Sequence, residues 1–166
     1  TDEAIRLRYG ALARAAAIGD LKAWESSPRR RLALILLLDQ FPRSLHRGTA
    51  DAFATDREAL SLAITGLQLG ADAVLEPVER IFFYMPLQHA ESAEVQAESV
   101  AAFRRLCDEV PPEMKALFAG VHAYAVQHRD IIGQFGRFPH RNAALGREST
   151  PEERAWLHGG GARFGQ

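Results

Sequence analysis

The chain has 166 residues, 47% of them hydrophobic, which is the size and composition of one compact domain with a buried core. Its 20 Lys and Arg residues are balanced by 21 Asp and Glu residues, so it lacks the strong basic field with which nucleic-acid-binding proteins attract their partner. No apolar run reaches the roughly 20 residues of a membrane span, and a single cysteine, Cys107, cannot form an internal disulfide. We therefore expect a cytoplasmic protein with one domain over residues 1–158, a flexible tail over residues 159–166, and no nucleic-acid or membrane partner.

Helical periodicity extends through the sequence, and no stretch alternates strictly between apolar and polar residues as a half-buried strand does. The first helix is expected over residues 2–17, where Gly19 and Asp20 interrupt the pattern. Short connections favour antiparallel neighbours, so the predicted fold class is all-α, built from antiparallel helix pairs. Glycine and proline mark the ends of most of the later helices, which are expected over residues 51–70, 77–83, 90–108, 112–135 and 151–157.

The most apolar helix is expected to begin at Pro28, because proline suits the first helical position. Residues 32–38 are apolar on every side, which predicts that this central helix is the most buried element. The three arginines at residues 29–31 are expected to form its solvated first turn. The helix is expected to end near Phe41, because Pro42 lacks an amide hydrogen and disfavours helical geometry in the residue before it.

Three short stretches are specific enough to indicate a family. They are Leu37-Leu38-Asp39-Gln40-Phe41-Pro42-Arg43, then Tyr84-Met85-Pro86-Leu87 with His89 and Glu91, and then Phe135-Gly136-Arg137-Phe138-Pro139-His140-Arg141-Asn142. In order and spacing they resemble a bacterial and fungal family of unknown function, DUF924, and the resemblance extends over residues 2–157. It implies an all-helical fold of the tetratricopeptide-like superfamily, a bundle or superhelix of helix pairs, without an established reaction.

Two histidines lie where their helices are expected to face the core. His128 belongs to the apolar stripe of one helix, and His89 and Gln96 belong to the stripe of another. A buried imidazole or amide must find hydrogen-bond partners, because leaving one unpaired costs about 1–3 kcal/mol. Asp39, at the inner end of the central helix, is a candidate partner. Histidine titrates near neutral pH, so Asp39, His89 and His128 are candidate catalytic acid–base residues, unless they form only a structural network between helices.

The segment after Phe135 is locally basic, with four cationic or titratable side chains and no acidic residue up to Arg147. Guanidinium groups bind carboxylates and phosphates through paired hydrogen bonds, so this segment is a candidate anion site. Alternatively, its arginines pair with acidic residues elsewhere and fasten helix ends together. The candidate ligand-binding residues are Arg43, Glu91, Gln96, Arg137, His140, Arg141, Asn142 and Arg147.

Two functions are open on the sequence alone. The first is a binding protein or an enzyme that takes a small anionic ligand into a pocket walled by the central helix and by the helices expected over residues 90–108 and 112–135. The second is an interaction module that holds an acidic peptide on the concave surface of its helix pairs. No metal or cofactor is expected, because no helix carries two metal ligands at the required spacing. Convergence of the polar residues on one pocket would favour the first function.

Overall fold

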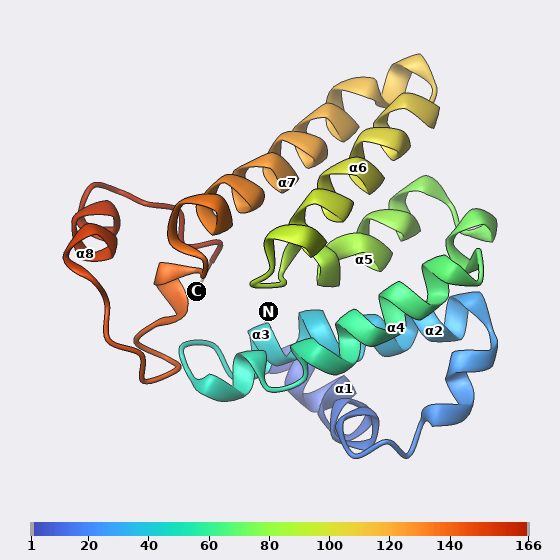
Figure 1. Ribbon diagram of the computed structural model, residues 1–166. Helices are drawn as coiled ribbons and strands as arrows, with labels where there is room; N and C mark the ends of the chain where they lie inside the picture. Colours follow the sequence, from blue (N-terminus) through green and yellow to red (C-terminus); the bar gives the residue numbers. More distant parts are fainter. Residues whose placement is uncertain (1, 166) are drawn as a thin grey trace.

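The computed structural model describes residues 2–165, and no strand occurs within this range (Figure 1). The all-α fold class predicted from the sequence is therefore confirmed. A π turn, η2 (Leu36–Gln40), joins α2 to α3, and short 3₁₀ turns form η1 (Lys22–Ser26), η3 (Ala50–Phe53), η4 (Ala71–Val74), η5 (Pro112–Met114) and η6 (Pro139–Arg141). The α-helices are α1 (Asp2–Ala17), α2 (Pro28–Ile35), α3 (Phe41–Leu45), α4 (Asp56–Gln68), α5 (Pro77–Gln88), α6 (Ala93–Glu109), α7 (Lys115–Phe135) and α8 (Pro151–His158).

The helices pack mostly against their neighbours in the chain. The two longest, α6 and α7, form an antiparallel hairpin, and α5 packs against α6 (Figure 1). On the other side of α5, α2 and α4 contact each other and α5, while α1 contacts α3 and the π turn. Gly70 and Gly136 end α4 and α7 with positive φ angles of 66° and 72°, as the sequence predicts. A regular tetratricopeptide-like superhelix stays a prediction.

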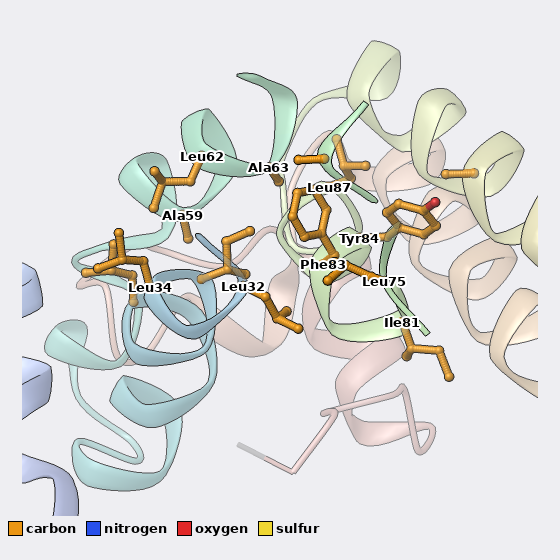
Figure 2. Close-up of a cluster of buried hydrophobic side chains, with 14 of the residues drawn as sticks. Leu32, Leu34, Ala59, Leu62, Ala63, Leu75, Ile81, Phe83, Tyr84 and Leu87 are labelled. Carbon is orange, nitrogen blue, oxygen red and sulfur yellow. The ribbon is translucent and has the colours of Figure 1, made fainter. Parts of the chain in front are cut away.

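The main core lies where α2, α4 and α5 meet (Figure 2). Gly66 of α4 makes this close approach possible, since a Cβ atom at that position would lie 2.5 Å from Cζ of Phe83 and 2.8 Å from Cδ of Arg31. Arg31 is not part of a solvated first turn as predicted. It is buried, and its guanidinium donates to the backbone carbonyls of Leu62 and Glu25 at 3.1 and 2.7 Å.

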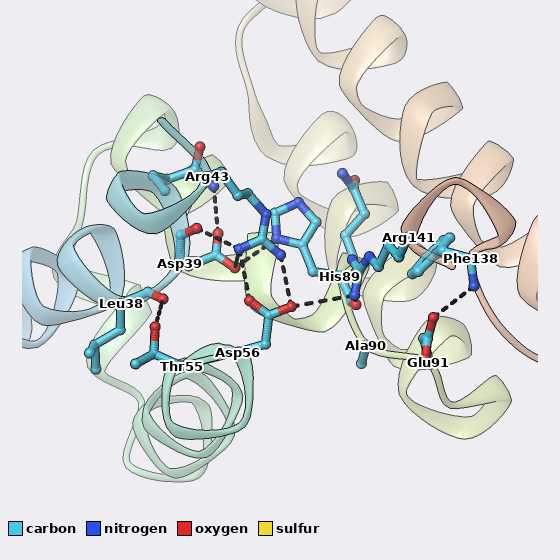
Figure 3. Close-up of polar contacts among 12 residues, drawn as sticks. Leu38, Asp39, Arg43, Thr55, Asp56, His89, Ala90, Glu91, Phe138 and Arg141 are labelled. Atoms are coloured by element: carbon cyan, nitrogen blue, oxygen red, sulfur yellow. Dashed lines mark hydrogen bonds and ion pairs between the residues drawn. The ribbon is translucent and has the colours of Figure 1, made fainter. Parts of the chain in front are cut away.

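The central helix does not end at Phe41 as predicted, because it continues through the π turn and α3 to Leu45. In a π turn, amides bond to carbonyls five residues back, which widens the helix locally. The widening accommodates Pro42, which has no amide hydrogen to donate. The Leu38 carbonyl, which the amide of residue 42 would bond in an α-helix, instead accepts a hydrogen bond from the Thr55 hydroxyl at 2.6 Å (Figure 3).

Three further helix boundaries differ from the prediction. The helix α4 begins at Asp56 and not at residue 51, because η3 forms a separate 3₁₀ turn over Ala50–Phe53. The helix expected over residues 77–83, α5, continues past Pro86 to Gln88. A proline in the last turn removes only one helical hydrogen bond, and Leu87 beyond it is fully buried. His89 consequently caps the end of α5 and does not belong to the stripe of the next helix. The helix expected over residues 90–108, α6, begins at Ala93 and not at residue 90. Ser92 is its N-cap, and the Ser92 hydroxyl accepts a hydrogen bond from the amide of Val95 at 3.4 Å.

Candidate functional site

A polar pocket of about 270 Å³ lies between the π turn, α3, the C-terminal end of α5, α7 and the loop that follows α7. The sequence predicts two of these walls, the central helix and α7, but the third wall is α5 and not the helix expected over residues 90–108. Several of the predicted site residues line the pocket. Its full lining is Gln40, Arg43, Ser44, Arg47, Phe53, Met85, Gln88, His89, Tyr124, His128, His140, Arg141 and Phe164.

Asp39 and His89 form a buried pair beside this pocket (Figure 3). Asp39 lies in the π turn, is fully buried, and places its Oδ1 atom 2.7 Å from Nδ1 of His89. Burial alone would raise the pKa of Asp39, but His89, Arg43 and a hydrogen bond from Gln40 outweigh it and hold the pKa at about 2. An ionised carboxylate only accepts hydrogen bonds, so Nδ1 of His89 carries the hydrogen and Nε2 carries the lone pair.

His89 is held as a neutral imidazole. Burial lowers its pKa, and the charges of Arg43 and Arg141 lower it further, although Asp39 opposes them. Its side chain is 14% exposed and forms part of the pocket wall. A neutral imidazole that is oriented by a carboxylate and has a lone pair on its outer nitrogen is the arrangement of a general base.

His128 and His140 add two more imidazoles to the wall. His128 is 1% exposed, and its Nδ1 atom donates to the backbone carbonyl of Tyr124 at 2.8 Å. The ring centroids of His89 and His128 are 6.2 Å apart, and the two histidines bond to different groups, His89 to the Asp39 carboxylate and His128 to the Tyr124 carbonyl. Burial lowers the pKa of His128 and of His140 to about 3, so both are neutral near neutral pH.

Two arginines of the pocket wall converge on one carboxylate, that of Asp56. Arg43 donates to both oxygens of Asp56, at 2.8 and 2.9 Å (Figure 3). Arg141 approaches Asp56 less closely, at 3.4 Å, and donates to the backbone carbonyl of His89 at 3.0 Å. His89 and Arg141 also line a second hollow of about 420 Å³, whose lining includes Asp56, so His89 and Arg141 lie between two cavities.

Arg141 is less well compensated than Arg43. It is 6% exposed, and the rings of Phe53 and Phe138 cover its guanidinium at 4.8 and 4.5 Å. Its Nε atom has no hydrogen-bond partner among the described residues. Burial lowers the pKa of Arg141 to about 10 even though Asp56 opposes it. A buried cation with an unused donor is stabilised by an additional negative group, so the pocket is electrostatically suited to an anion.

Arg137 and Asn142 do not line the pocket. Arg137 donates to both carboxylate oxygens of Glu153, at 2.7 and 2.9 Å, and Asn142 donates to the same carboxylate at 3.0 Å. Glu153 is 2% exposed and also closes the predicted capping box with Thr150 at the start of α8. These side chains therefore fasten α8 to the preceding loop.

Three further predicted ligand-binding residues also bond within the protein, outside the pocket. Arg147 donates to both oxygens of Glu91, at 2.6 and 2.9 Å, and Glu91 accepts the backbone amide of Phe138 at 2.8 Å (Figure 3). Gln96 donates to two backbone carbonyls at the end of α5, at 2.7 and 2.9 Å. The sequence-based alternative, in which loop arginines pair with acidic residues, thus describes Arg137 and Arg147.

Sequence reasoning missed several side chains of the site, among them Asp56, Phe53 and Phe164. Asp56 resembles any acidic residue in the first turn of a helix, and nothing near Phe53 marks it as a wall of the site. Phe164 belongs to the tail predicted to be flexible, yet its ring stacks on His128 with a centroid distance of 3.8 Å. An aromatic residue in a glycine-rich stretch was the available signal for it. The mobility of the tail stays a prediction.

The chemistry of the site rests on imidazole, carboxylate and guanidinium groups. Among residues 2–165, no group of three or more His, Cys, Asp and Glu side chains is arranged to hold a metal ion. The helices in that same part of the chain are too short or too polar to cross a membrane.

A family model described as "Bacterial protein of unknown function (DUF924)" matches residues 1–161. The chain belongs to the DUF924 family. The solved structure of the protein of unknown function ATU0120 from Agrobacterium tumefaciens is similar to it, with 41% sequence identity, a TM-score of 0.77, and coverage of 95% of this chain and 84% of that chain. No curated protein matches the chain. DUF924 membership confirms the resemblance seen in the sequence and supplies a fold without a reaction, so function has to be argued from the site.

Proposed function

We propose that the protein binds a small anionic ligand in the polar pocket and that His89, oriented by Asp39, acts on it as an acid–base residue. The observation that carries the proposal is Arg141, a buried cation with an unused Nε donor and a pKa lowered to about 10. Arg43 and His140 line the same pocket and complete the proposed anion site. We place this activity in the cytoplasm.

The acid–base part of the proposal rests on the Asp39–His89 pair. A buried carboxylate that accepts from Nδ1 fixes the tautomer and the ring orientation of a histidine, as in known acid–base sites. The carboxylate lies in a π turn, and such turns occur frequently at functional sites. His128 is the second acid–base candidate, since its Nδ1 atom also donates and its ring also faces the pocket.

The alternative function, an interaction module for an acidic peptide, has less support. A module of this kind needs basic side chains spread along an open surface. Here Arg137 and Arg147 are paired with Glu153 and Glu91, and the other cationic residues predicted for the site, Arg43 and Arg141, line one pocket.

The test uses titrations of the ¹⁵N-labelled protein with butyrate and with inorganic phosphate, followed by NMR. We expect at least one of them to shift the resonances around the pocket saturably, and Arg141→Gln to weaken binding about tenfold or more, because a hydrogen bond to a charged group contributes about 1.5–3 kcal/mol. Arg137→Gln is the matched control. It should lower the melting temperature, since Glu153 loses its bidentate partner, and leave the affinity unchanged.

Long-range ¹H–¹⁵N correlations test the histidine. Wild-type His89 should show the tautomer with hydrogen on Nδ1, and Asp39→Asn should change its tautomer or its pKa. Equal affinities of the wild type and Arg141→Gln for both anions would contradict the proposed anion site. A His89 signal that is the same with and without the Asp39 carboxylate would contradict the proposed acid–base pair.

A further inference from the structure

An apolar groove opens directly beside the polar pocket. It has a volume of about 280 Å³ and lies between the second half of α5, the middle of α6 and the first half of α7. Two of its side chains, Leu117 and Tyr124, are 59% and 44% exposed, although both are large and hydrophobic. Exposed apolar surface that is gathered in a hollow, and not scattered, is typical of a binding site.

The groove and the polar pocket adjoin each other. Met85, Gln88 and Tyr124 line both of them, so these three side chains form the border between the two hollows. On the pocket side of this border lie His89 and Arg141, and on the groove side the lining is apolar. A ligand that spans the border therefore meets charge at one end and hydrocarbon at the other.

We propose that the ligand of the pocket is an anionic amphiphile with a single alkyl chain. Its acidic head lies against Arg43 and Arg141, and its chain lies in the groove over Gly120. The proposal rests on the anion site described above and specifies the class of ligand that the site takes. A carboxylate and a phosphate head share the chemistry that guanidinium groups recognise, so both are included in the test.

The experiment measures affinities by isothermal titration calorimetry for two pairs of probes that differ only in the chain. The pairs are butyrate and octanoate, and inorganic phosphate and octyl phosphate. Each methylene that leaves water strengthens binding by up to about fourfold, equivalent to about 0.8 kcal/mol. We expect the long-chain member of a pair to bind the wild type about tenfold or more tightly than the short one. The pair with the stronger binding identifies the head group.

Gly120→Leu fills the groove without disturbing the protein. A Cβ atom at residue 120 would have no neighbour within 4 Å, so the new side chain extends into open space above α7. Leucine is also a better helix former than glycine, so the variant should melt no lower than the wild type. We expect its affinity for the long-chain probe to fall to that of the short probe. Gly133→Leu, on the same helix with equally open space and outside the groove, should change neither affinity.

The outcomes separate this inference from the proposed anion site. Equal affinities for long and short probes in the wild type, or an unchanged long-chain affinity in Gly120→Leu, overturn the amphiphile. If Arg141→Gln still weakens the short probe in that case, the anion site stands alone. Long-chain binding that depends on residue 120 but not on Arg141 overturns the anion site and the amphiphile with it. If no probe binds the wild type, both proposals fall.

Discussion

At the scale of single residues, burial determines the charge of the pocket. Three histidines line it, and burial lowers the pKa of each, while Asp39 keeps a carboxylate with a pKa of about 2 behind His89. The imidazoles are therefore available as hydrogen-bond acceptors or bases at neutral pH, and the positive charge belongs to Arg43 and Arg141. A ligand entering the pocket meets neutral imidazoles and two arginines that share the Asp56 carboxylate.

The buried histidines predict a particular pH dependence of stability. His128 has a pKa of about 3 in the folded protein against 6.5 normally, so between these values the unfolded chain binds more protons. The free energy of unfolding should therefore be greatest above about pH 6.5 and should fall as the pH drops toward 3, by up to about 1.4 kcal/mol per pH unit for this residue. His89 and His140 act in the same direction.

Urea unfolding at about pH 7 and about pH 4.5 measures this effect, in a range that stays above the titration of Asp39. We expect His128→Gln to lose part of the difference in stability between the two pH values. The same substitution at the exposed His158 is the control. A pH dependence that changes equally in both variants, or in neither, would contradict the assignment to His128.

At the scale of elements, the π turn links the helix core to the site. It places Asp39 opposite His89, and Pro42, which follows it, has no amide hydrogen to donate to the Leu38 carbonyl. Side chains bond two carbonyls of the turn: the Thr55 hydroxyl donates to that of Leu38, and the Arg43 guanidinium donates to that of Asp39 at 2.5 Å. The same arginine also contacts the Asp39 carboxylate at 3.3 Å, so Arg43 stabilises both the π turn and the site.

Removing the Thr55 hydroxyl should destabilise the fold. Thr55→Val keeps the shape of the side chain but leaves the Leu38 carbonyl without its donor, which costs about 1–3 kcal/mol for a buried group. In the double variant with Pro42→Ala, a new amide hydrogen can bond that carbonyl, so part of the loss should be recovered. Thr65→Val, at an exposed position of α4, should have little effect.

Chemical denaturation of the four proteins gives the coupling between residues 42 and 55. A positive coupling, in which Pro42→Ala costs less when Thr55 is already Val, is the expected result. Strictly additive effects would show that the hydroxyl does not replace the missing helical bond.

At the scale of the whole molecule, the core depends on one close approach between helices. Gly66 lies where α2, α4 and α5 meet, with the fully buried Phe83 on one side and Arg31 on the other. An added methyl group at residue 66 would approach both side chains more closely than non-bonded atoms normally do, in a close-packed interior. Gly66 thus permits the close approach of α4 to α5, the helix that His89 caps.

Gly66→Ala should therefore be destabilising, by about 1–3 kcal/mol, because the added methyl group would lie 2.5 Å from Cζ of Phe83. The matched control is Gly120→Ala, in α7, where nothing lies within 4 Å of the new atom. There the same substitution should stabilise the protein by about 0.4–1 kcal/mol through helix propensity and the entropy of the unfolded chain. Thermal melting of both variants measures the contrast, and equal shifts in the same direction would contradict this account of the core.

The sequence predicts those features of the fold whose signals lie in neighbouring residues of the chain. Helix ends marked by Gly70, Gly136 and the Thr150 capping box were predictable, because each depends on residues adjacent in the chain. The helices that continue through Pro42 and Pro86 were not, since the bonds that a proline removes are replaced by distant groups or outweighed by burial. The hydroxyl that donates to the Leu38 carbonyl belongs to Thr55, at the start of α4, and no pattern in the residues around Leu38 predicts this contact.

The site was predictable in its residue types but not in its partners. The inward stripe of α7 identified His128, because periodicity shows which side of a helix is buried, and the basic loop identified His140 and Arg141. His89 was identified as a site residue but was assigned to the wrong helix. These signals did not show that Asp56 would join Arg43 to Arg141, or that Glu153 would engage Arg137. Ion pairs form between segments far apart in the chain, so their pairing depends on the finished fold.

The π turn has a consequence for comparing this chain with its relatives. A π turn contains one residue more than the α-helical turn it replaces, and each residue advances an α-helix by about 100°. A relative with an uninterrupted helix here would be one residue shorter between Ile35 and Pro42, and a gapless alignment would match Asp39 with a residue on a different side of the helix. We therefore expect a single-residue insertion or deletion at this point, and not a substitution of Asp39, to separate relatives that retain the pocket from those that have lost it.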